Sequence, residues 1–141
     1  MLNTLRNNEM NDNASLAAAF YQAFNTNDHA AFDRLLAANW VNHPADPGQP
    51  NTPAGFKRAV AHTHAAFEGF HIDIEAVVAE NDLVVCRIAM SGRHVGDFDR
   101  WKASGQQARF SGMDMHRIEG GRISETWHFE NFDGLKTEET A

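Results

Sequence analysis

An aspartate stands in the middle of a segment that otherwise has the composition of a β-strand. Asp114 lies within residues 110–116, although aspartate is uncommon in strands. Because strand side chains alternate between two faces, Gly112, Asp114 and His116 share one face. Burial raises the pKa of a carboxylate and nearby positive charge or hydrogen-bond donors lower it, so this group is a candidate base for removing a proton next to a carbonyl. The alternative is a partly exposed aspartate on the outer face, or one bonded to an arginine.

His128 is placed to face Asp114 across a hairpin. The Gly120–Gly121 turn joins residues 107–118 to residues 123–131, and counting outward from it pairs positions whose numbers sum to about 241. Asp114 then lies opposite Trp127 or His128. Such a pair could shuttle a proton, with the carboxylate fixing the tautomer of the imidazole. The alternative is a histidine that is hydrogen-bonded at a dimer interface or at the sheet edge.

Three further polar residues are candidates for binding a substrate. Asn42 and His43 lie just before a proline-rich loop, residues 44–53, which is a natural rim for a cavity. Asn42 could hydrogen-bond a substrate carbonyl, or it could bond local backbone as a turn residue. His94 lies in the bend between Gly92 and Gly96, where it points into the pocket or caps a strand end.

Several aromatic residues are candidates for the wall of a cavity. Trp40, Phe110 and Trp127 have core or lid positions by default, but some aromatic rings must line any pocket. A pocket lined in this way favours a flat, apolar ligand. We therefore take these three residues as predicted substrate-binding residues.

Metal-dependent and nucleophilic chemistry have little support. His62 and His64 are two positions apart on a predicted helix, so they point in different directions and cannot chelate one ion. Cys86 lies in the apolar run 83–86 with no neighbouring base, which indicates an inert core thiol. We therefore expect no metal site.

The charge balance excludes some partners. The chain has 141 residues, with 12 Lys and Arg against 19 Asp and Glu, for a net charge of −7. This argues against binding to nucleic acid or to anionic membranes. The first 15 or so residues lack an apolar signal segment, no run approaches the roughly 20 apolar residues that span a bilayer, and one cysteine excludes an internal disulfide framework. We expect a cytoplasmic protein.

The elements that must position these residues follow an α+β order. Apolar spacing predicts helices over residues 14–24, over residues 29–39 after an Asp28 cap, and over residues 55–67. Alternation then predicts four antiparallel strands, over 70–78, 83–94, 107–118 and 123–131. A curved sheet of this kind can wrap around the helices and enclose a cone-shaped pocket. We expect one domain over residues 1–141, with residues 1–12 as a flexible N-terminal extension.

The order of several short motifs resembles one known family. They are Asn42-His43-Pro44, Gly92-Arg93-His94-Val95-Gly96, Arg109-Phe110-Ser111-Gly112, and the closing stretch from Gly121 to Leu135. Together they resemble the SnoaL-like polyketide cyclases of the NTF2-like superfamily. The resemblance implies an NTF2-like cone that forms a homodimer, needs no cofactor or metal, and closes a ring by intramolecular aldol condensation.

The resemblance also carries over individual positions. The matched site residues are Asn42, Asp114 and His128, but His128 stands where the family's aldol cyclases have the catalytic aspartate, and Asp114 stands where they have a pocket histidine. We therefore expect acid/base catalysis by Asp114 and His128 on a small hydrophobic carbonyl compound, by ring closure or isomerisation. The alternatives are a non-catalytic protein that binds a hydrophobic metabolite, and addition of water as in epoxide hydrolases of the same fold.

Overall fold

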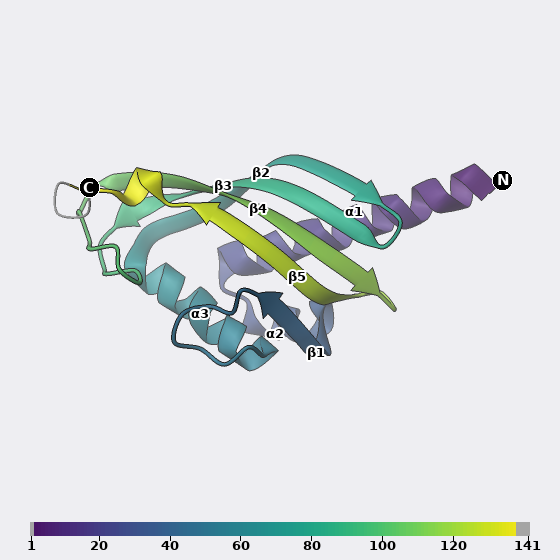
Figure 1. Cartoon of the computed structure of the whole chain (residues 1–141), viewed down its shortest axis with the longest axis horizontal. Coiled ribbons are helices and arrows are strands. Elements are labelled where there is room, and N and C mark those ends of the chain that lie inside the picture. Colours follow the sequence, from purple (N-terminus) through teal and green to yellow (C-terminus); the bar gives the residue numbers. More distant parts are fainter. Residues whose placement is uncertain (1, 138–141) are drawn as a thin grey trace.

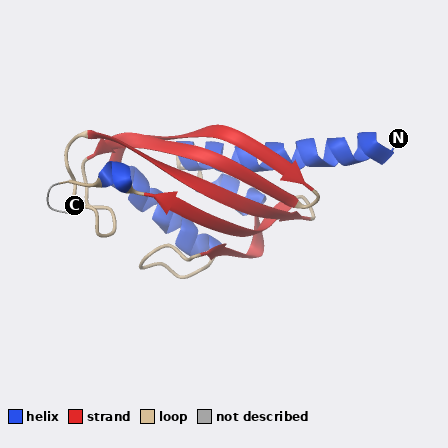
Figure 2. Cartoon of the chain, turned by 45° about the horizontal axis from the view of Figure 1, so that its top comes forward, coloured by secondary structure: helices blue, strands red, loops and turns tan. Residues whose placement is uncertain are grey.

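The computed structural model describes residues 2–137, which form a curved sheet with helices against one face (Figures 1 and 2). Its elements in chain order are α1 (Leu2–Thr26), α2 (His29–Leu35), β1 (Leu36–His43), α3 (Pro53–Ala66), β2 (Phe67–Glu80), β3 (Leu83–His94), β4 (Gln107–Glu119), β5 (Arg122–Asn131) and the 3-10 helix η1 (Asp133–Leu135). The predicted α+β arrangement is confirmed.

The sheet in this part of the chain has five strands in the order β1-β5-β4-β3-β2. Strands β2 to β5 pair antiparallel, as predicted, and β1 runs parallel to β5 at the other edge. Register shifts in β2, between Glu68 and His71 and again between Ile74 and Ala76, interrupt its pairing with β3. Such irregularities increase the twist of a sheet, which helps it to curve around the helices.

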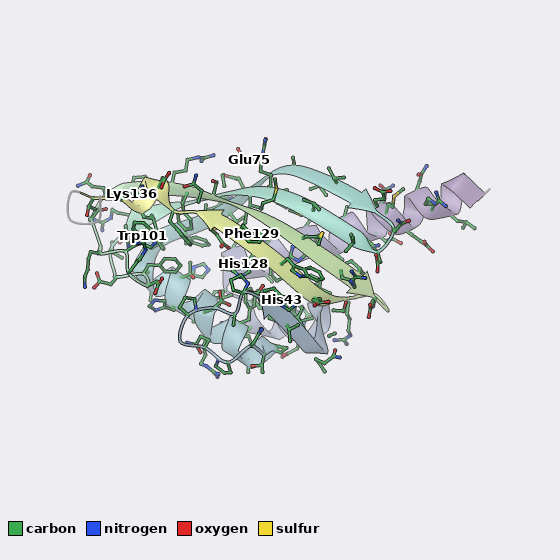
Figure 3. All side chains as sticks on the ribbon, viewed as in Figure 1. His43, Glu75, Trp101, His128, Phe129 and Lys136 are labelled. Carbon is green, nitrogen blue, oxygen red and sulfur yellow. The ribbon has the colours of Figure 1, made fainter. Side chains whose placement is uncertain are left out.

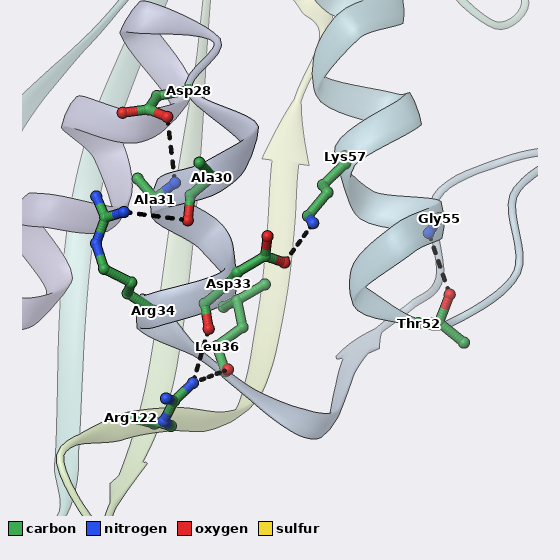
Figure 4. Close-up of polar contacts among 10 residues, drawn as sticks. All are labelled: Asp28, Ala30, Ala31, Asp33, Arg34, Leu36, Thr52, Gly55, Lys57 and Arg122. Carbon is green, nitrogen blue, oxygen red and sulfur yellow. Dashed lines mark hydrogen bonds and ion pairs between the residues drawn. The ribbon is translucent and has the colours of Figure 1, made fainter.

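Strand β1 corrects the sequence prediction of a helix that runs to residue 39. Helix α2 instead ends at Leu35, and the next eight residues form β1, a strand that the sequence analysis did not predict. The Arg122 side chain donates hydrogen bonds to the carbonyl oxygens of Asp33, at 2.7 Å, and Leu36, at 3.2 Å (Figure 4). Arg122 is far away in the sequence, so a local pattern of apolar residues could not reveal where this helix ends.

Side chains cap the starts of α2 and α3, and the sequence predicted the first of these two caps. The Asp28 side chain accepts a hydrogen bond from the Ala31 backbone at 3.2 Å, which confirms its predicted role as the cap of α2. Thr52 caps α3 in the same way, with Pro53 in the first turn. An ion pair between Asp33 and Lys57 also joins α2 to α3 (Figure 4).

Helix α1 begins earlier than predicted. Residues 2–12, which we set apart as a flexible extension, form its first turns and project beyond the sheet (Figure 1). From residue 4 to residue 12 the side chains are exposed, apart from half-buried Met10. The mobility of these turns stays a prediction. No helix within residues 2–137 is long and apolar enough to cross a membrane.

The other end of α1 is attached to the sheet by polar contacts. The Asn25 side chain donates to the Ile72 carbonyl at 3.0 Å and accepts from the Ile72 backbone amide at 2.7 Å. These bonds use backbone groups on edge strand β2, so they hold the last turns of α1 against the sheet. Tyr21, one turn earlier, therefore has a defined position over the concave face.

Candidate functional site

A cavity of about 510 Å³ lies between the helices and the concave face of the sheet. Its walls are mainly aromatic and aliphatic side chains from both layers, which suits an apolar ligand. The apolar lining residues include Phe20, Phe24, Phe56, Phe70, Ile72, Ile88, Met90, Phe98, Trp101, Phe110 and Phe132. Trp101 lies at the end of the molecule away from the start of α1 (Figure 3).

The polar part of the lining is acidic. Four carboxylates take part, Asp46, Asp99, Asp114 and Glu130, together with His62 and His128. Within residues 2–137, neither lysine nor arginine lines this cavity. A charged ligand group therefore meets mostly negative charge here.

Asp114 lies on the concave face of β4, as the alternation predicts, and only 7% of it is exposed. Its Oδ2 accepts a hydrogen bond from the Tyr21 hydroxyl at 2.6 Å. Burial raises the pKa of this carboxyl to about 6, against the lowering effects of the Tyr21 hydrogen bond and the His128 charge, while Glu130 raises it further. Asp114 is thus mainly ionised at neutral pH yet basic enough to take a proton.

The Tyr21 hydroxyl also contacts a second buried residue. His116 Nε2 lies 2.8 Å from the Tyr21 oxygen, and His116 Nδ1 lies 2.9 Å from Thr126 Oγ1. The Trp40 indole donates to that same Thr126 oxygen at 3.0 Å. Burial lowers the pKa of His116 to about 4, so the ring is neutral at pH 7 and has one N–H.

Counting the protons sets the direction of these bonds. An ionised Asp114 can only accept, so the Tyr21 proton points to it and His116 Nε2 must be the donor to the Tyr21 oxygen. His116 Nδ1 then accepts from Thr126. The bonds from Trp40 to Asp114 all point the same way, and we call these five residues (Trp40, Thr126, His116, Tyr21 and Asp114) the Asp114 relay. They hold the carboxylate in one orientation.

His128 is a cation held at the rim of the cavity. Its Nδ1 lies 2.6 Å from Glu130 Oε1 and its Nε2 lies 2.7 Å from the Pro44 carbonyl oxygen. Both partners can only accept, so both ring nitrogens must carry protons. Burial by itself lowers the pKa of His128, but the hydrogen bond and charge of Glu130, with smaller contributions from Pro44 and Asp46, raise it to about 9.

Of the two predicted partners of Asp114, Trp127 and His128, the structure has His128, because a register shift between Arg117 and Ile118 moves the pairing by one residue. The hydrogen bonds of Asp114 and His128 go elsewhere, however. Glu130, rather than Asp114, fixes the His128 ring, and Tyr21 bonds Asp114. Because both N–H groups of His128 are engaged, its contribution at neutral pH is a positive charge rather than an exchangeable tautomer.

Asn42 lines the cavity, as expected of a rim residue, and is 5% exposed. Its backbone N–H donates to Asn51 Oδ1, and its backbone carbonyl accepts from Asn51 Nδ2, both at 2.8 Å. Its side-chain nitrogen faces Asp46 Oδ2 at 3.5 Å, and its Oδ1 has no hydrogen-bond partner within residues 2–137. The free atom is therefore the acceptor oxygen rather than the donor that a substrate carbonyl would need.

The remaining predicted binding residues are divided between the cavity and other places. Phe110 lines the cavity. Trp40 and His94 are buried in the core, where Trp40 belongs to the Asp114 relay and His94 stacks on Phe67 with 4.6 Å between ring centres. Neither residue lines the cavity.

His43 and Trp127 form a separate pair that does not line the cavity. Their rings stack with 5.3 Å between centres, and His43 Nε2 lies 2.7 Å from Glu125. His128, in contrast, lines the cavity. Strand alternation accounts for this separation, because Glu125 and Trp127 point away from the face that carries Thr126 and His128.

Sequence reasoning missed five polar residues of the site: Tyr21, Asp46, His116, Thr126 and Glu130. His116, Thr126 and Glu130 had a usable signal, since alternation places them on the faces of Asp114 and His128. Tyr21 had none beyond its place beside Phe20 on an apolar helix face, and Asp46 lies in a loop whose course the sequence does not show. Within residues 2–137, no group of three or more His, Cys, Asp or Glu side chains could hold a metal ion.

Comparison with known proteins supports the fold described above. The family described as SnoaL-like polyketide cyclase matches residues 15–138. Among solved structures, the chain is similar to TsrD from Streptomyces laurentii, with 25% identity, a TM-score of 0.78, and coverage of 88% of this chain and 91% of that one. IdmH from Streptomyces antibioticus is similar at 26% identity, with a TM-score of 0.76 and coverage of 87% and 94%.

A more distant structure shows the fold alone. A SnoaL-like polyketide cyclase from Agrobacterium tumefaciens shares 13% identity, with a TM-score of 0.75 and coverage of 87% of this chain and 94% of that one. A search of curated proteins finds no match. The predicted NTF2-like fold class is confirmed by these comparisons.

Proposed function

Because the chain belongs to the SnoaL-like polyketide cyclase family, which indicates a cyclase-type role, we propose that it catalyses enolate chemistry on a small hydrophobic carbonyl compound. Asp114 is the base in this proposal, and intramolecular aldol ring closure or isomerisation is the outcome. One observation carries it: a buried carboxylate, hydrogen-bonded by Tyr21 and with a pKa of about 6, faces an apolar cavity.

The first step is proton abstraction. Tyr21 occupies Asp114 Oδ2, and no other group within residues 2–137 donates a hydrogen bond to Oδ1, which makes Oδ1 the atom to receive the proton. The bond between the α-carbon and its hydrogen breaks, and the electron pair forms an enolate. A carboxylate with a pKa near 6 is well matched to this task at neutral pH.

The second step closes the ring and returns the proton. The enolate carbon attacks a second carbonyl carbon of the same molecule, which forms a carbon–carbon bond and an alkoxide. The alkoxide takes the proton from Asp114 and restores the carboxylate. In an isomerisation, the same proton returns to a different carbon. His128 contributes a fixed positive charge that favours the negatively charged enolate.

The cavity wall supplies shape rather than reactivity. Phenylalanine rings from α1, α3 and the sheet surround the site, and they leave room for a flat molecule of several rings. Exclusion of water by these rings strengthens the interaction between His128 and a developing negative charge.

Exchange of an acidic carbon-bound hydrogen tests the proposal without the natural substrate. The α-hydrogens of 2-tetralone exchange with D2O through the enolate, and NMR measures the rate. We expect Asp114→Asn to lower the enzyme-catalysed rate at least about 100-fold while the protein stays folded. Asp73→Asn, an exposed carboxylate on β2, is the matched control and should retain the rate.

Three results would contradict the proposal. Unchanged exchange in the Asp114→Asn protein would remove Asp114 as the base. Binding of 2-tetralone without any catalysed exchange in the native protein would favour a non-catalytic binding protein. Hydration of an epoxide analogue with no exchange of the ketone would favour water addition.

The convex face of the sheet supports a further part of the proposal, a homodimer. Large apolar side chains are exposed there, with Val78 63%, Met113 49% and Phe129 76% accessible. Phe129 directly follows His128 on β5 (Figure 3). We expect light scattering to give twice the monomer mass, and Phe129→Glu to lower it to that of the monomer; a monomeric native protein would contradict this part.

A further inference from the structure

Most side-chain donors that line the cavity already have a partner. The donors that bond to acceptors of the protein belong to Tyr21, Asn42, Thr63, Thr126 and His128. Gln49 Nε2 and both ring nitrogens of His62 have no hydrogen-bond partner within residues 2–137. The Trp101 indole has none either, but Trp101 is only 3% exposed. Gln49 and His62 are therefore the accessible side chains that can still donate to a ligand.

Gln49 is held with its amide group in one orientation. Residues 46–49 form a β-turn, in which the Gln49 backbone N–H donates to the Asp46 carbonyl at 3.1 Å and Gly48 has a φ of +76°. Arg58 Nε donates to Gln49 Oε1 at 2.9 Å. A guanidinium can only donate, so this contact fixes the amide oxygen and leaves the NH2 group free. Gln49 is half-buried but its Nε2 is not enclosed, so a ligand can reach it.

His62 lies one helical turn after Arg58 on α3, so the two side chains are neighbours on that helix. The His62 ring is exposed and lies nearly parallel to the Phe98 ring, with 5.9 Å between centres and 14° between planes. Phe98 packs in turn on Phe67 and Phe110. Stacking thus positions the His62 ring without using its nitrogens, and an imidazole has at least one N–H in either protonation state.

The charges in the cavity favour a neutral acceptor over an anion at these donors. Asp46, Asp99 and Glu130 line the same cavity and repel an anion. The His128 cation also lines it and attracts an anion, but Glu130 lies 2.6 Å from His128 Nδ1 and offsets part of that charge. Both N–H groups of His128 are already bonded, so it offers no hydrogen bond. A carbonyl oxygen gains the bonds of Gln49 and His62 without the repulsion.

We propose that Gln49 and His62 form a donor subsite at the exposed side of the cavity, and that this subsite binds a carbonyl oxygen of the ligand. The proposal rests on the proposed function, because an intramolecular aldol substrate has two carbonyl groups. One adjoins the carbon that loses its proton to buried Asp114, and the subsite takes the other. Gln49 and His62 are then residues that determine specificity, and the substrate is a dicarbonyl compound whose outer carbonyl is uncharged.

A matched pair of aromatic compounds tests the subsite by equilibrium dialysis at pH 7.5. In 2-isopropenylnaphthalene a CH2 group replaces the carbonyl oxygen of 2-acetylnaphthalene, so the ratio of their affinities reports the hydrogen bond. Gln49→Glu keeps an acceptor for Arg58 but has no N–H, and His62→Phe keeps a ring to stack on Phe98. We expect each variant to lower the ratio of ketone to hydrocarbon affinity about fivefold. An unchanged ratio in either variant would overturn the proposal.

Two controls separate the hydrogen bond from other effects. Gln49→Met removes the donor without adding charge and should lower the ratio as Gln49→Glu does; a native ratio in Gln49→Met would overturn the role of the Gln49 donor. Thr63→Val changes a hydroxyl that lines the cavity but donates to the Ala59 carbonyl at 2.9 Å, so the ratio should persist.

The charge of the preferred ligand is tested with 2-naphthoate. We expect the native protein to bind this anion more weakly than 2-acetylnaphthalene. Tighter binding of 2-naphthoate would overturn the assignment of an uncharged carbonyl.

The two proposals fail separately. Binding needs no turnover, so the affinity ratio should be the same in the Asp114→Asn protein. A ratio that Gln49→Glu and His62→Phe leave unchanged, together with intact 2-tetralone exchange in the native protein, would overturn the subsite alone. A ratio that falls in both variants, without Asp114-dependent exchange, would overturn the proposed function alone.

Discussion

The Tyr21 hydroxyl lies 2.6 Å from Asp114 Oδ2, although the two residues are 93 positions apart in the chain. One comes from the first helix and the other from the fourth strand, so this contact forms only when α1 docks on the concave face of the sheet. His116 lies behind Tyr21 and donates to its oxygen, which leaves the Tyr21 proton for Asp114. The packing of α1 on the sheet therefore contributes to the pKa of Asp114, through the Tyr21 hydrogen bond.

Removal of the Tyr21 hydroxyl should make Asp114 more basic. The hydrogen bond from Tyr21 favours the ionised carboxylate, so Tyr21→Phe should raise the pKa of Asp114 above 6, by about one pH unit. The midpoint of the rate–pH profile for 2-tetralone exchange reports this value. Thr63→Val, which changes a cavity hydroxyl that Asp114 does not contact, should leave the midpoint in place. A midpoint that does not move in Tyr21→Phe would show that this bond does not set the basicity.

Ionised Asp114 should lower the free energy of unfolding at neutral pH. Its folded pKa of about 6 is above the ordinary 3.8, so stability is fully present below about 3.8 and is lost as the pH rises through 6. Asp114→Asn should therefore unfold at higher denaturant than the native protein at pH 7.5, by on the order of 3 kcal/mol, and with little difference at pH 3.5. Urea unfolding at both pH values measures this. An equal gain in the free energy of unfolding at pH 7.5 and at pH 3.5 would mean that the ionisation of Asp114 is not the cause.

His116 should make the protein sensitive to acid. Its folded pKa of about 4 is below the ordinary 6.5, so its contribution is present above 6.5 and is lost as the pH falls through 4. Between pH 7 and 4, the native protein should lose on the order of 3 kcal/mol more than His116→Gln does. His71→Gln, an exposed histidine on β2, is the control and should follow the native curve. Parallel curves for the native protein and His116→Gln would refute a neutral, buried His116.

Glu130 should be the reason that His128 is charged. Glu130→Gln removes the main group that raises the pKa of His128, so its titration should move well below pH 9, whereas the native ring should remain protonated through pH 8. NMR titration of the histidine rings measures both. Glu125→Gln breaks the similar His43 pair, which lies outside the cavity, and should leave His128 unchanged. A native His128 that titrates near 6.5 would contradict the assignment.

Much of the fold and part of the site follow from local sequence patterns. Alternation and the Gly120–Gly121 turn are sufficient to place Asp114 opposite Trp127 or His128, because a hairpin register depends mainly on residues near the turn. The unpredicted register shift between Arg117 and Ile118 decides for His128. The Asp28 cap of α2 is equally local. These predictions succeed because their causes lie within a few residues of one another.

The rest depends on contacts between distant segments. Strand β1 begins where Arg122 ends α2, and Tyr21 meets Asp114 only after two layers pack. The side chain that bonds His128 is Glu130, two residues along the same strand face. The second partner, the Pro44 carbonyl, comes from a distant loop, so the sequence could not show how the His128 ring is held. Asn42 was expected to donate to a substrate carbonyl, but its side-chain nitrogen faces Asp46, which comes from a loop whose course the sequence does not show.

The pH dependence of 2-tetralone exchange tests the central claim most directly, since it links the rate to the ionisation of Asp114. We predict that the rate rises with pH, with a midpoint near 6, and levels off above it in the native protein, and that this dependence disappears in Asp114→Asn. A rate that does not vary between pH 4.5 and 8, or a midpoint that survives in Asp114→Asn, would contradict the assignment of Asp114 as the base.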